Sequence, residues 1–209
     1  MSTRSYQQLC GLAYALDVIG ERWTLLIIRE LIPGPGRFTD LLEGLPGIST
    51  NLLSTRLKQL EERGVLRRRE LPPPAGVMVY ELTALGRSLE ASLLELGRWG
   101  AQFVPAEPGE DRLLHLGSYA LTPKTFFRAE LAAGVDDTYE LEIDGERQQV
   151  RVKDGELTVR QGAAAEADVV LRTDVETYLG LLRGQIGPEE AAEEGLIEVE
   201  GDPGALRRF

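Results

Sequence analysis

Cysteine and histidine are nearly absent from this chain of 209 residues, which contains one of each. A single cysteine excludes an internal disulfide, and one histidine with one cysteine cannot supply the ligands of a typical zinc site. His115, the one histidine, has no serine or cysteine placed to form a nucleophilic pair with it, so we expect a structural or surface role. Glycine-rich phosphate loops and the acidic spacing of a calcium loop are also missing. We therefore expect no metal, no cofactor and no enzymatic activity.

Long apolar segments are missing as well. No run approaches the roughly 18 residues that a membrane-spanning helix needs. The first twelve residues lack the apolar core of a signal peptide. We therefore expect a cytoplasmic protein that has no membrane partner.

Positive charge is scarce overall but unevenly distributed. The formal net charge is −11, yet residues 1–104 contain 12 basic and 11 acidic side chains, whereas residues 105–209 contain 11 and 23. Residues 49–69 alone contain six basic and two acidic side chains. The local field decides where a polyanion docks. The N-terminal half can therefore bind nucleic acid, while the acidic half would repel it.

The length is comfortable for two domains of about 100 residues each. Residues 105–110, Pro-Ala-Glu-Pro-Gly-Glu, have the composition of a linker and mark the change in charge. We expect an α+β chain with a mostly helical domain over residues 1–104 and an α+β domain over residues 111–209.

The N-terminal domain is expected to be mostly helical with one β-hairpin. Apolar residues recur at helical spacing, and proline and glycine mark the loops between the helices. The expected elements are a helix over residues 9–31 with a break near Gly20, a loop over 33–36, a short helix over 37–42, a turn over 45–47, a helix over 48–64 and strands over 65–70 and 77–82.

The helix over residues 48–64 has two contrasting faces. Leu53, Leu57 and Leu60 form one apolar stripe, and Ser49 can cap the N-terminus. The opposite face presents short hydrogen-bonding side chains and one cation: Asn51, Ser54, Thr55 and Lys58. Such a face suits a helix that enters the DNA major groove, although an ordinary amphipathic surface helix has the same pattern.

The interpretation of this region as a DNA reader assigns roles to individual side chains. Base edges are assigned to Thr50, Asn51, Ser54 and Thr55, and phosphates to Arg37, Ser49, Lys58, Arg67, Arg68 and Arg69. Arg56 lies at the flank of the helix, where it either braces the helix or contacts DNA.

A further helix is expected after Thr83, with Leu85, Leu89, Leu93 and Leu96 at helical spacing. This apolar stripe either forms a dimer interface or packs on its own domain.

The C-terminal domain alternates short strands, turns and helices, which predicts a mainly antiparallel sheet. Its large apolar residues either line a ligand cavity or fill a solid core. The candidate lining residues are Phe126, Phe127, Leu171, Tyr178, Leu179, Leu182 and Leu196. Because none of these is charged, the expected ligand is a hydrophobic small molecule with at most a small polar end.

Cys10 has three possible roles: a small apolar core residue, a redox-sensing thiol, or neither. The sequence has no basic residue between Tyr6 and Val18, so nothing nearby in the sequence is expected to lower the pKa of this thiol.

Residues from about 10 to 99 resemble the HxlR-type regulators, a branch of the winged-helix transcription factors. The matching segments occur in one register: Ala15–Gly20, Arg22–Ile27, Gly34-Pro35, Arg37-Phe38, Leu45–Ser49, Leu53-Ser54, Arg56-Leu57, Leu60-Glu61, Gly64, Tyr80–Thr83, Gly86 and Trp99-Gly100. The resemblance implies a homodimer on a roughly palindromic operator, with the recognition helices in successive major grooves.

Two positions depart from that family. Its members usually have Cys-Pro near the start, where this chain has Cys10-Gly11, and a basic residue is common at the wing tip, where this chain has prolines and alanine. The second departure argues against a minor-groove contact by the tip.

Residues from about 138 to 209 resemble the sterol-carrier-protein type-two fold. The matching segments are Ala167–Thr173, Gly184, Glu194-Gly195 and Val199–Asp202. The resemblance implies an apolar cavity between a sheet and helices that can hold a lipid or another hydrophobic molecule.

Together these patterns predict a homodimeric regulator that binds double-stranded DNA and responds to a hydrophobic ligand. The alternative is a lipid- or small-molecule-binding protein whose winged helix serves only dimerisation.

Overall fold

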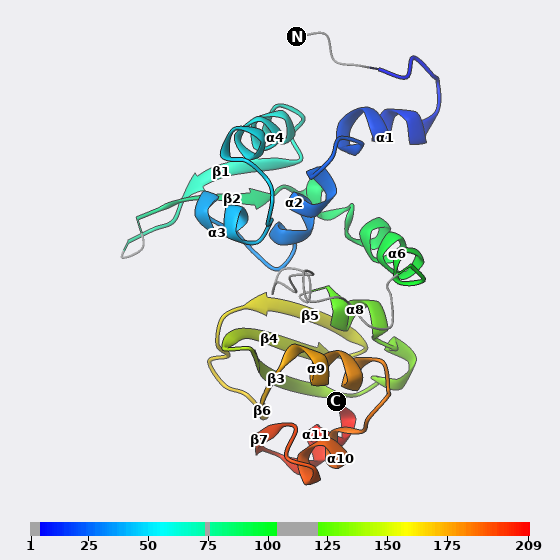
Figure 1. Ribbon diagram of the computed structural model, residues 1–209, viewed down its shortest axis with the longest axis vertical. Helices are drawn as coiled ribbons and strands as arrows, with labels where there is room; N and C mark the ends of the chain where they lie inside the picture. Colours follow the sequence, from blue (N-terminus) through cyan, green and yellow to red (C-terminus); the bar gives the residue numbers. More distant parts are fainter. Residues whose placement is uncertain (1–4, 74–75, 104–120) are drawn as a thin grey trace. The chain divides into compact units, whose positions relative to one another are not determined.

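The computed structural model describes residues 5–73, 76–103 and 121–209. The chain divides into two compact units, Met1–Ala106 and Glu107–Phe209, each combining helices with a sheet (Figure 1). The α+β fold class predicted from the sequence is therefore confirmed. The predicted linker over residues 105–110 lies outside the described residues, as does His115.

The N-terminal unit is mostly helical and contains one two-stranded sheet (Figure 1). The predicted break near Gly20 separates the first two helices, and Trp23 directly precedes the second with a positive φ of 78°. The elements are α1 (Gly11–Ile19), α2 (Thr24–Leu31), α3 (Phe38–Glu43), α4 (Thr50–Glu62), β1 (Leu66–Glu70), β2 (Met78–Leu82), α5 (Ala84–Arg87) and α6 (Glu90–Ala101).

Buried leucine and isoleucine side chains form the core of this unit. Each of the helices α2, α3 and α4 contributes one apolar face, because residues three and four apart point the same way. The fully buried members include Ile27, Ile28, Leu31, Leu41, Leu45, Leu53, Leu57 and Leu60. This packing fixes which face of α4 remains in solvent.

The hairpin β1–β2 follows α4 directly, as the sequence predicted. The strands are antiparallel, with Leu66 opposite Leu82 and Arg67 opposite Glu81. Gly86, just beyond the hairpin, is required by close packing, because a Cβ atom there would lie 2.1 Å from the carbonyl oxygen of Val65. Residues 74–75, at the hairpin tip, lie outside the described residues.

The C-terminal unit is built on a five-stranded sheet in the order β5-β4-β3-β6-β7 (Figure 1). Its β3–β6 pair is parallel and the other three pairs are antiparallel, so the predicted mainly antiparallel sheet is confirmed. The strands are β3 (Asp136–Ile143), β4 (Glu146–Lys153), β5 (Glu156–Gln161), β6 (Val169–Thr173) and β7 (Glu198–Gly201). The helices are α8 (Thr122–Phe126), the 3₁₀ turn η1 (Ala129–Leu131), α9 (Val175–Leu182), α10 (Pro188–Glu193) and α11 (Pro203–Arg208).

Alternate residues of the central strands form the core of this unit. Tyr139 and Leu141 of β3, Val150 of β4 and Leu171 of β6 are buried together with Tyr178 of α9. No helix in the described part of the chain is long and apolar enough to cross a membrane.

Candidate DNA-binding surface and ligand cavity

Helix α4 presents a polar face to solvent. Its apolar stripe, Leu53, Leu57 and Leu60, is at most 1% exposed. The Ser49 Oγ caps the helix by accepting a hydrogen bond from the backbone N–H of Leu52 at 3.3 Å. The residues assigned to base edges and the neighbouring cation are all exposed: Thr50, Asn51, Ser54, Thr55 and Lys58. The predicted division of the helix into two faces is present, and contact with DNA stays a prediction.

Two of these side chains have local partners that limit what they can offer DNA. The Thr55 hydroxyl donates to the Asn51 carbonyl at 2.8 Å, so towards DNA it presents its acceptor lone pairs. The Lys58 ammonium lies 3.8 Å from a Glu62 carboxylate oxygen, and both side chains are well exposed. Because exposed pairs of this kind are weak, Lys58 can exchange Glu62 for a phosphate at little cost.

Arg56 braces α4 in this structure. Its side chain is only 12% exposed. Its guanidinium donates to the Arg22 carbonyl at 3.2 Å, to Gln59 at 2.8 Å and to a Glu21 carboxylate oxygen at 2.7 Å. These contacts tie α4 to the segment between α1 and α2, which supports the first of the two roles left open by the sequence.

The wing arginines all have acidic partners. Arg67 and Arg69 lie on one face of β1 and both donate at 2.6 Å to Glu81, whose side chain is only 8% exposed. Arg68 lies on the other face and contacts Glu61 at 3.1 Å. The hydrogen bonds from Arg69 and Arg67 lower the pKa of Glu81, although its burial raises it.

Glu81 is a functional candidate that the sequence reasoning missed. The local positive charge was counted over residues 49–69, and Glu81 lies outside that window. The register Arg67 opposite Glu81 is the signal that could have identified it. The field at the base of the wing is therefore weaker than the count of arginines suggested.

Arg37 provides a positive charge on the other side of α4 in the chain. Its backbone N–H donates to Asp40 Oδ2 at 2.9 Å at the start of α3, and its side chain is exposed. Among the described residues its guanidinium has no ion-pair partner within 4.0 Å. It is therefore available to a phosphate.

Helices α1 and α6 have large apolar side chains in solvent. Only Ala13 of α1 is buried, and α6 has no buried residue. On α6, Leu96 is 47% exposed and Trp99 is 60% exposed. The predicted apolar stripe after Thr83 therefore does not pack fully on its own domain, which leaves a surface for another chain to cover.

Cys10 is exposed at the N-cap position of α1. Hydrogen bonds from the backbone N–H groups of Ala13 and then Leu12 lower the pKa of its thiol. This corrects the expectation that nothing nearby lowers that pKa: the helix N-terminus supplies what basic side chains do not. The reading of Cys10 as a buried core residue is also wrong.

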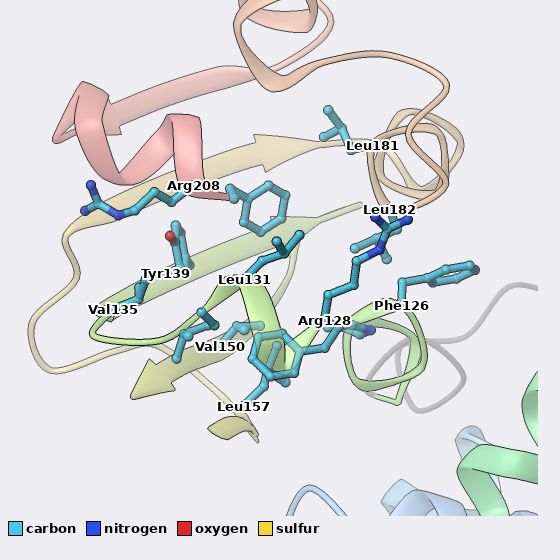
Figure 2. A pocket seen from close by; sticks show the side chains of 15 residues that line it. Phe126, Arg128, Leu131, Val135, Tyr139, Val150, Leu157, Leu181, Leu182 and Arg208 are labelled. Atoms are coloured by element: carbon cyan, nitrogen blue, oxygen red, sulfur yellow. The ribbon is translucent and has the colours of Figure 1, made fainter. Parts of the chain in front are cut away.

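The C-terminal unit contains a cavity of about 380 Å³. Its wall is formed by the α8–η1 segment, strands β3 to β5, the end of α9 and the C-terminal residues (Figure 2). The lining is mostly apolar and comprises Pro123, Phe126, Phe127, Arg128, Leu131, Ala132, Val135, Tyr139, Val150, Val152, Leu157, Leu181, Leu182, Arg208 and Phe209.

The structure divides the seven candidate lining residues into two groups. Phe126, Phe127 and Leu182 line the cavity. The other four do not: Leu171 and Tyr178 are fully buried in solid core, Leu179 packs against that core and Leu196 is 43% exposed. The apolar pattern was the same for all seven, because residues that fill a core and residues that line a cavity obey the same periodicity.

The cavity wall also contains two arginines, which corrects the expectation of an uncharged lining. Arg208 is paired with Asp137 through two hydrogen bonds of 2.7 and 2.8 Å. The bond from Arg208, with a further one from Tyr139, lowers the pKa of Asp137 against the effect of burial. Arg128 has no ion-pair partner among the described residues.

Metal binding finds no support in the described part of the chain, where His, Cys, Asp and Glu form no group of three that could hold an ion. Tyr178 and Gln148 are the largest polar side chains of the buried core, and the Gln148 amide donates to the Tyr178 hydroxyl at 3.2 Å. Burial raises the pKa of Tyr178, so this phenol stays neutral and acts as a structural group.

Comparison with known proteins separates the two halves of the chain. The HxlR-like helix-turn-helix family matches residues 18–108, and the SCP-2 sterol transfer family matches residues 123–209. The HTH-type transcriptional regulator YodB of Bacillus subtilis is 40% identical over 96 residues, which are 46% of this chain and 84% of YodB. An uncharacterised HTH-type transcriptional regulator of Synechocystis is 35% identical over 106 residues, which are 51% of this chain and 78% of that protein.

Solved structures resemble the N-terminal half alone in extent. The crystal structure of quinone-bound YodB from B. subtilis is 37% identical in sequence and covers 44% of this chain and 97% of its own, with a TM-score of 0.39.

Proposed function

This chain belongs to the HxlR-like helix-turn-helix family, and from that premise we propose that it is a homodimeric transcriptional regulator whose C-terminal domain senses a small hydrophobic ligand. The observation that carries the proposal is the exposed polar face of α4, held in place by a fully buried leucine stripe. Relatives with this half of the chain are HTH-type transcriptional regulators.

DNA recognition is assigned to α4 as the recognition helix. Asn51, Ser54 and Thr55 have the short side chains that reach base edges in the major groove. Lys58 and Arg37 flank them and can hold phosphates, which fix the register without reading the sequence. The wing arginines contribute to the field but are shared with Glu81 and Glu61, so we assign them a smaller part than the sequence suggested.

Dimerisation is assigned to α1 and α6, whose apolar side chains are uncovered in the single chain. A two-fold dimer would place two copies of α4 about one helical turn of DNA apart, roughly 34 Å, on a palindromic operator. This arrangement explains why two helices of a small domain keep large apolar residues in solvent.

Ligand sensing is assigned to the cavity of the C-terminal unit. Its volume of about 380 Å³ lies within the range of small-molecule sites, and most of its wall is apolar. The match of residues 123–209 to the SCP-2 sterol transfer family supports a site for a small molecule.

The test of DNA reading is fluorescence anisotropy with the DNA upstream of the protein's own gene and with random DNA of equal length. Asn51→Ala is expected to reduce the preference for the upstream DNA by about 1–3 kcal/mol and to leave affinity for random DNA unchanged. Lys58→Ala is expected to weaken binding to both DNAs and to reduce the slope of log K against log salt by about one.

Glu62→Gln is the matched control, since it removes the exposed partner of Lys58 without removing a cation. Absence of salt-dependent binding to either DNA would favour the different-class alternative, a small-molecule-binding protein whose winged helix only dimerises.

A further inference from the structure

The two arginines of the cavity wall differ in how their charge is balanced. Arg208 forms a two-point contact with Asp137, and Asp202 lies 3.9 Å from the same guanidinium. Its charge is therefore neutralised by the protein itself. Figure 2 shows the guanidinium of Arg208 at the edge of the group of lining residues, away from Leu182 and Phe126.

Asp137 also fixes the wall around Arg208. The Tyr139 hydroxyl lies 3.0 Å from Asp137 Oδ2 and 3.0 Å from the Ala205 carbonyl. The ring of Phe209 lies 5.2 Å from that of Tyr139. Because Arg208 is held by this cluster, releasing it to a ligand would leave the buried carboxylate of Asp137 without its partner.

Arg128 is placed differently. It lies between α8 and η1, with a cavity-lining residue, Phe127, before it in the chain. Figure 2 shows its side chain extended along the cavity toward the end where Leu182 and Phe126 lie. No carboxylate of the described residues lies within ion-pair distance of it. An otherwise apolar cavity thus has one cation that the described residues leave unpaired.

An arginine beside an apolar cavity has two uses. Its aliphatic stem can cover apolar surface while its guanidinium stays in water. Alternatively, the guanidinium can bind an anion, and its planar fork of donors suits a carboxylate in particular. The second use gives the cavity a direction, with an apolar interior and a cationic end.

We propose that Arg128 binds the anionic head group of the cavity ligand, so that this site selects amphiphiles with an apolar tail and a carboxylate end. The inference rests on the proposed ligand-binding function of the C-terminal unit and assigns its ligand class. The tail lies against Val150, Val152 and Leu157, and the carboxylate accepts hydrogen bonds from the Arg128 guanidinium. A sterol, which has no anionic group, would leave this contact unused.

The test compares three ligands with the same ten-carbon chain and different ends: decanoate, 1-decanol and decyltrimethylammonium. Each displaces the neutral dye Nile red from the full-length protein at pH 8 and below its micellar concentration. Decanoate is expected to bind at least tenfold more tightly than 1-decanol, the range of a hydrogen-bonded contact to a charged group. Decyltrimethylammonium is expected to bind more weakly than 1-decanol.

Arg128→Gln is expected to abolish the tenfold preference and to leave the affinity for 1-decanol unchanged, which shows that the cavity is intact. Arg128→Lys should retain a preference for decanoate, because it keeps the charge. Arg160→Gln is the matched control, since Arg160 is an exposed arginine of β5 outside the cavity wall. It should bind all three ligands as the unaltered protein does.

The outcomes separate this inference from the proposed function. If Arg128→Gln keeps the preference for decanoate, or if no preference exists, Arg128 only covers the cavity with its stem and the inference is wrong while ligand binding stands. If Nile red and all three ligands fail to bind, the ligand-sensing half of the proposed function fails with it.

Discussion

At the scale of single residues, the polar face of α4 is the part of the site that the sequence predicted best. A helix of 3.6 residues per turn places Leu53, Leu57 and Leu60 on one side, so the opposite side follows from spacing alone. Partners in tertiary contact could not be obtained in this way. Glu81 meets Arg67 because of a strand register, and Arg56 meets Glu21 across 35 positions of the chain.

Glu81 gives a prediction about stability and pH. Its pKa is lowered in the folded protein, so its ionised form stabilises the fold at pH values above its ordinary pKa of about 4.3. That contribution is lost as the pH falls through the lowered, folded-state pKa. Glu81→Gln should therefore reduce the free energy of unfolding by roughly 1–3 kcal/mol at pH 7, with a smaller difference in acid.

Urea unfolding of both proteins between pH 7 and pH 3 measures this difference. Glu62→Gln, at an exposed glutamate of α4, is the control and should change stability little at any pH. A Glu81→Gln effect of equal size at every pH would show that the carboxylate charge is not what stabilises the wing.

Cys10 gives a second prediction at this scale. Because two backbone N–H groups lower its pKa, the thiol should react with iodoacetamide faster at pH 7 than an unperturbed cysteine. As the only cysteine in the chain, it can be followed directly by mass spectrometry. The pH at which the alkylation rate is half-maximal should lie below the roughly 8.5 of a free thiol. A midpoint at or above that value contradicts the assignment.

At the scale of helices and strands, the order of elements was predictable and their pairing was only partly so. The break at Gly20, the helix α4 and the following hairpin arise from local signals. The helix expected after Thr83 is divided into α5 and α6. The parallel β3–β6 pair joins strands that are separated in the chain by two others, and no local pattern reports such a contact.

Helices α1 and α6 yield a prediction about assembly. Leu96 is already exposed in the single chain, so Leu96→Asp should leave the fold intact. In a dimer built on α6, the same change buries an unpaired carboxylate, which costs several kcal/mol and should produce monomers. Sedimentation equilibrium measures the outcome.

Met78→Asp is the matched control, since Met78 is an exposed apolar residue of β2 that lies outside both helices. It should remain dimeric. If the Leu96→Asp protein sediments as a folded dimer, α6 is not at the centre of the interface.

At the scale of the whole molecule, the division into two functional halves was visible in the charge distribution, because the acidic excess lies beyond residue 104. The existence of a cavity was a different matter. Leu171 and Leu182 are equivalent in the sequence pattern, yet one is fully buried in core and the other lines the cavity. Whether apolar side chains meet or leave a space between them depends on how the sheet and helices are placed, which periodicity does not encode.

Coupling between the two halves is what makes the proposed protein a sensor. A ligand that binds the DNA-free and DNA-bound forms equally shifts nothing, however tightly it binds. A ligand that distinguishes them must change operator affinity, and the operator must change ligand affinity by the same factor. This reciprocity provides an internal check on any measured effect.

The most direct test of the account is therefore a pair of titrations on the full-length protein. The dissociation constant for the upstream DNA is measured with and without saturating decanoate, and that for decanoate with and without saturating DNA. The account predicts that both constants change by the same factor, between about 5 and 150. If DNA and decanoate each bind and neither changes the affinity of the other, the two halves are not coupled and the protein is not a sensor of this kind.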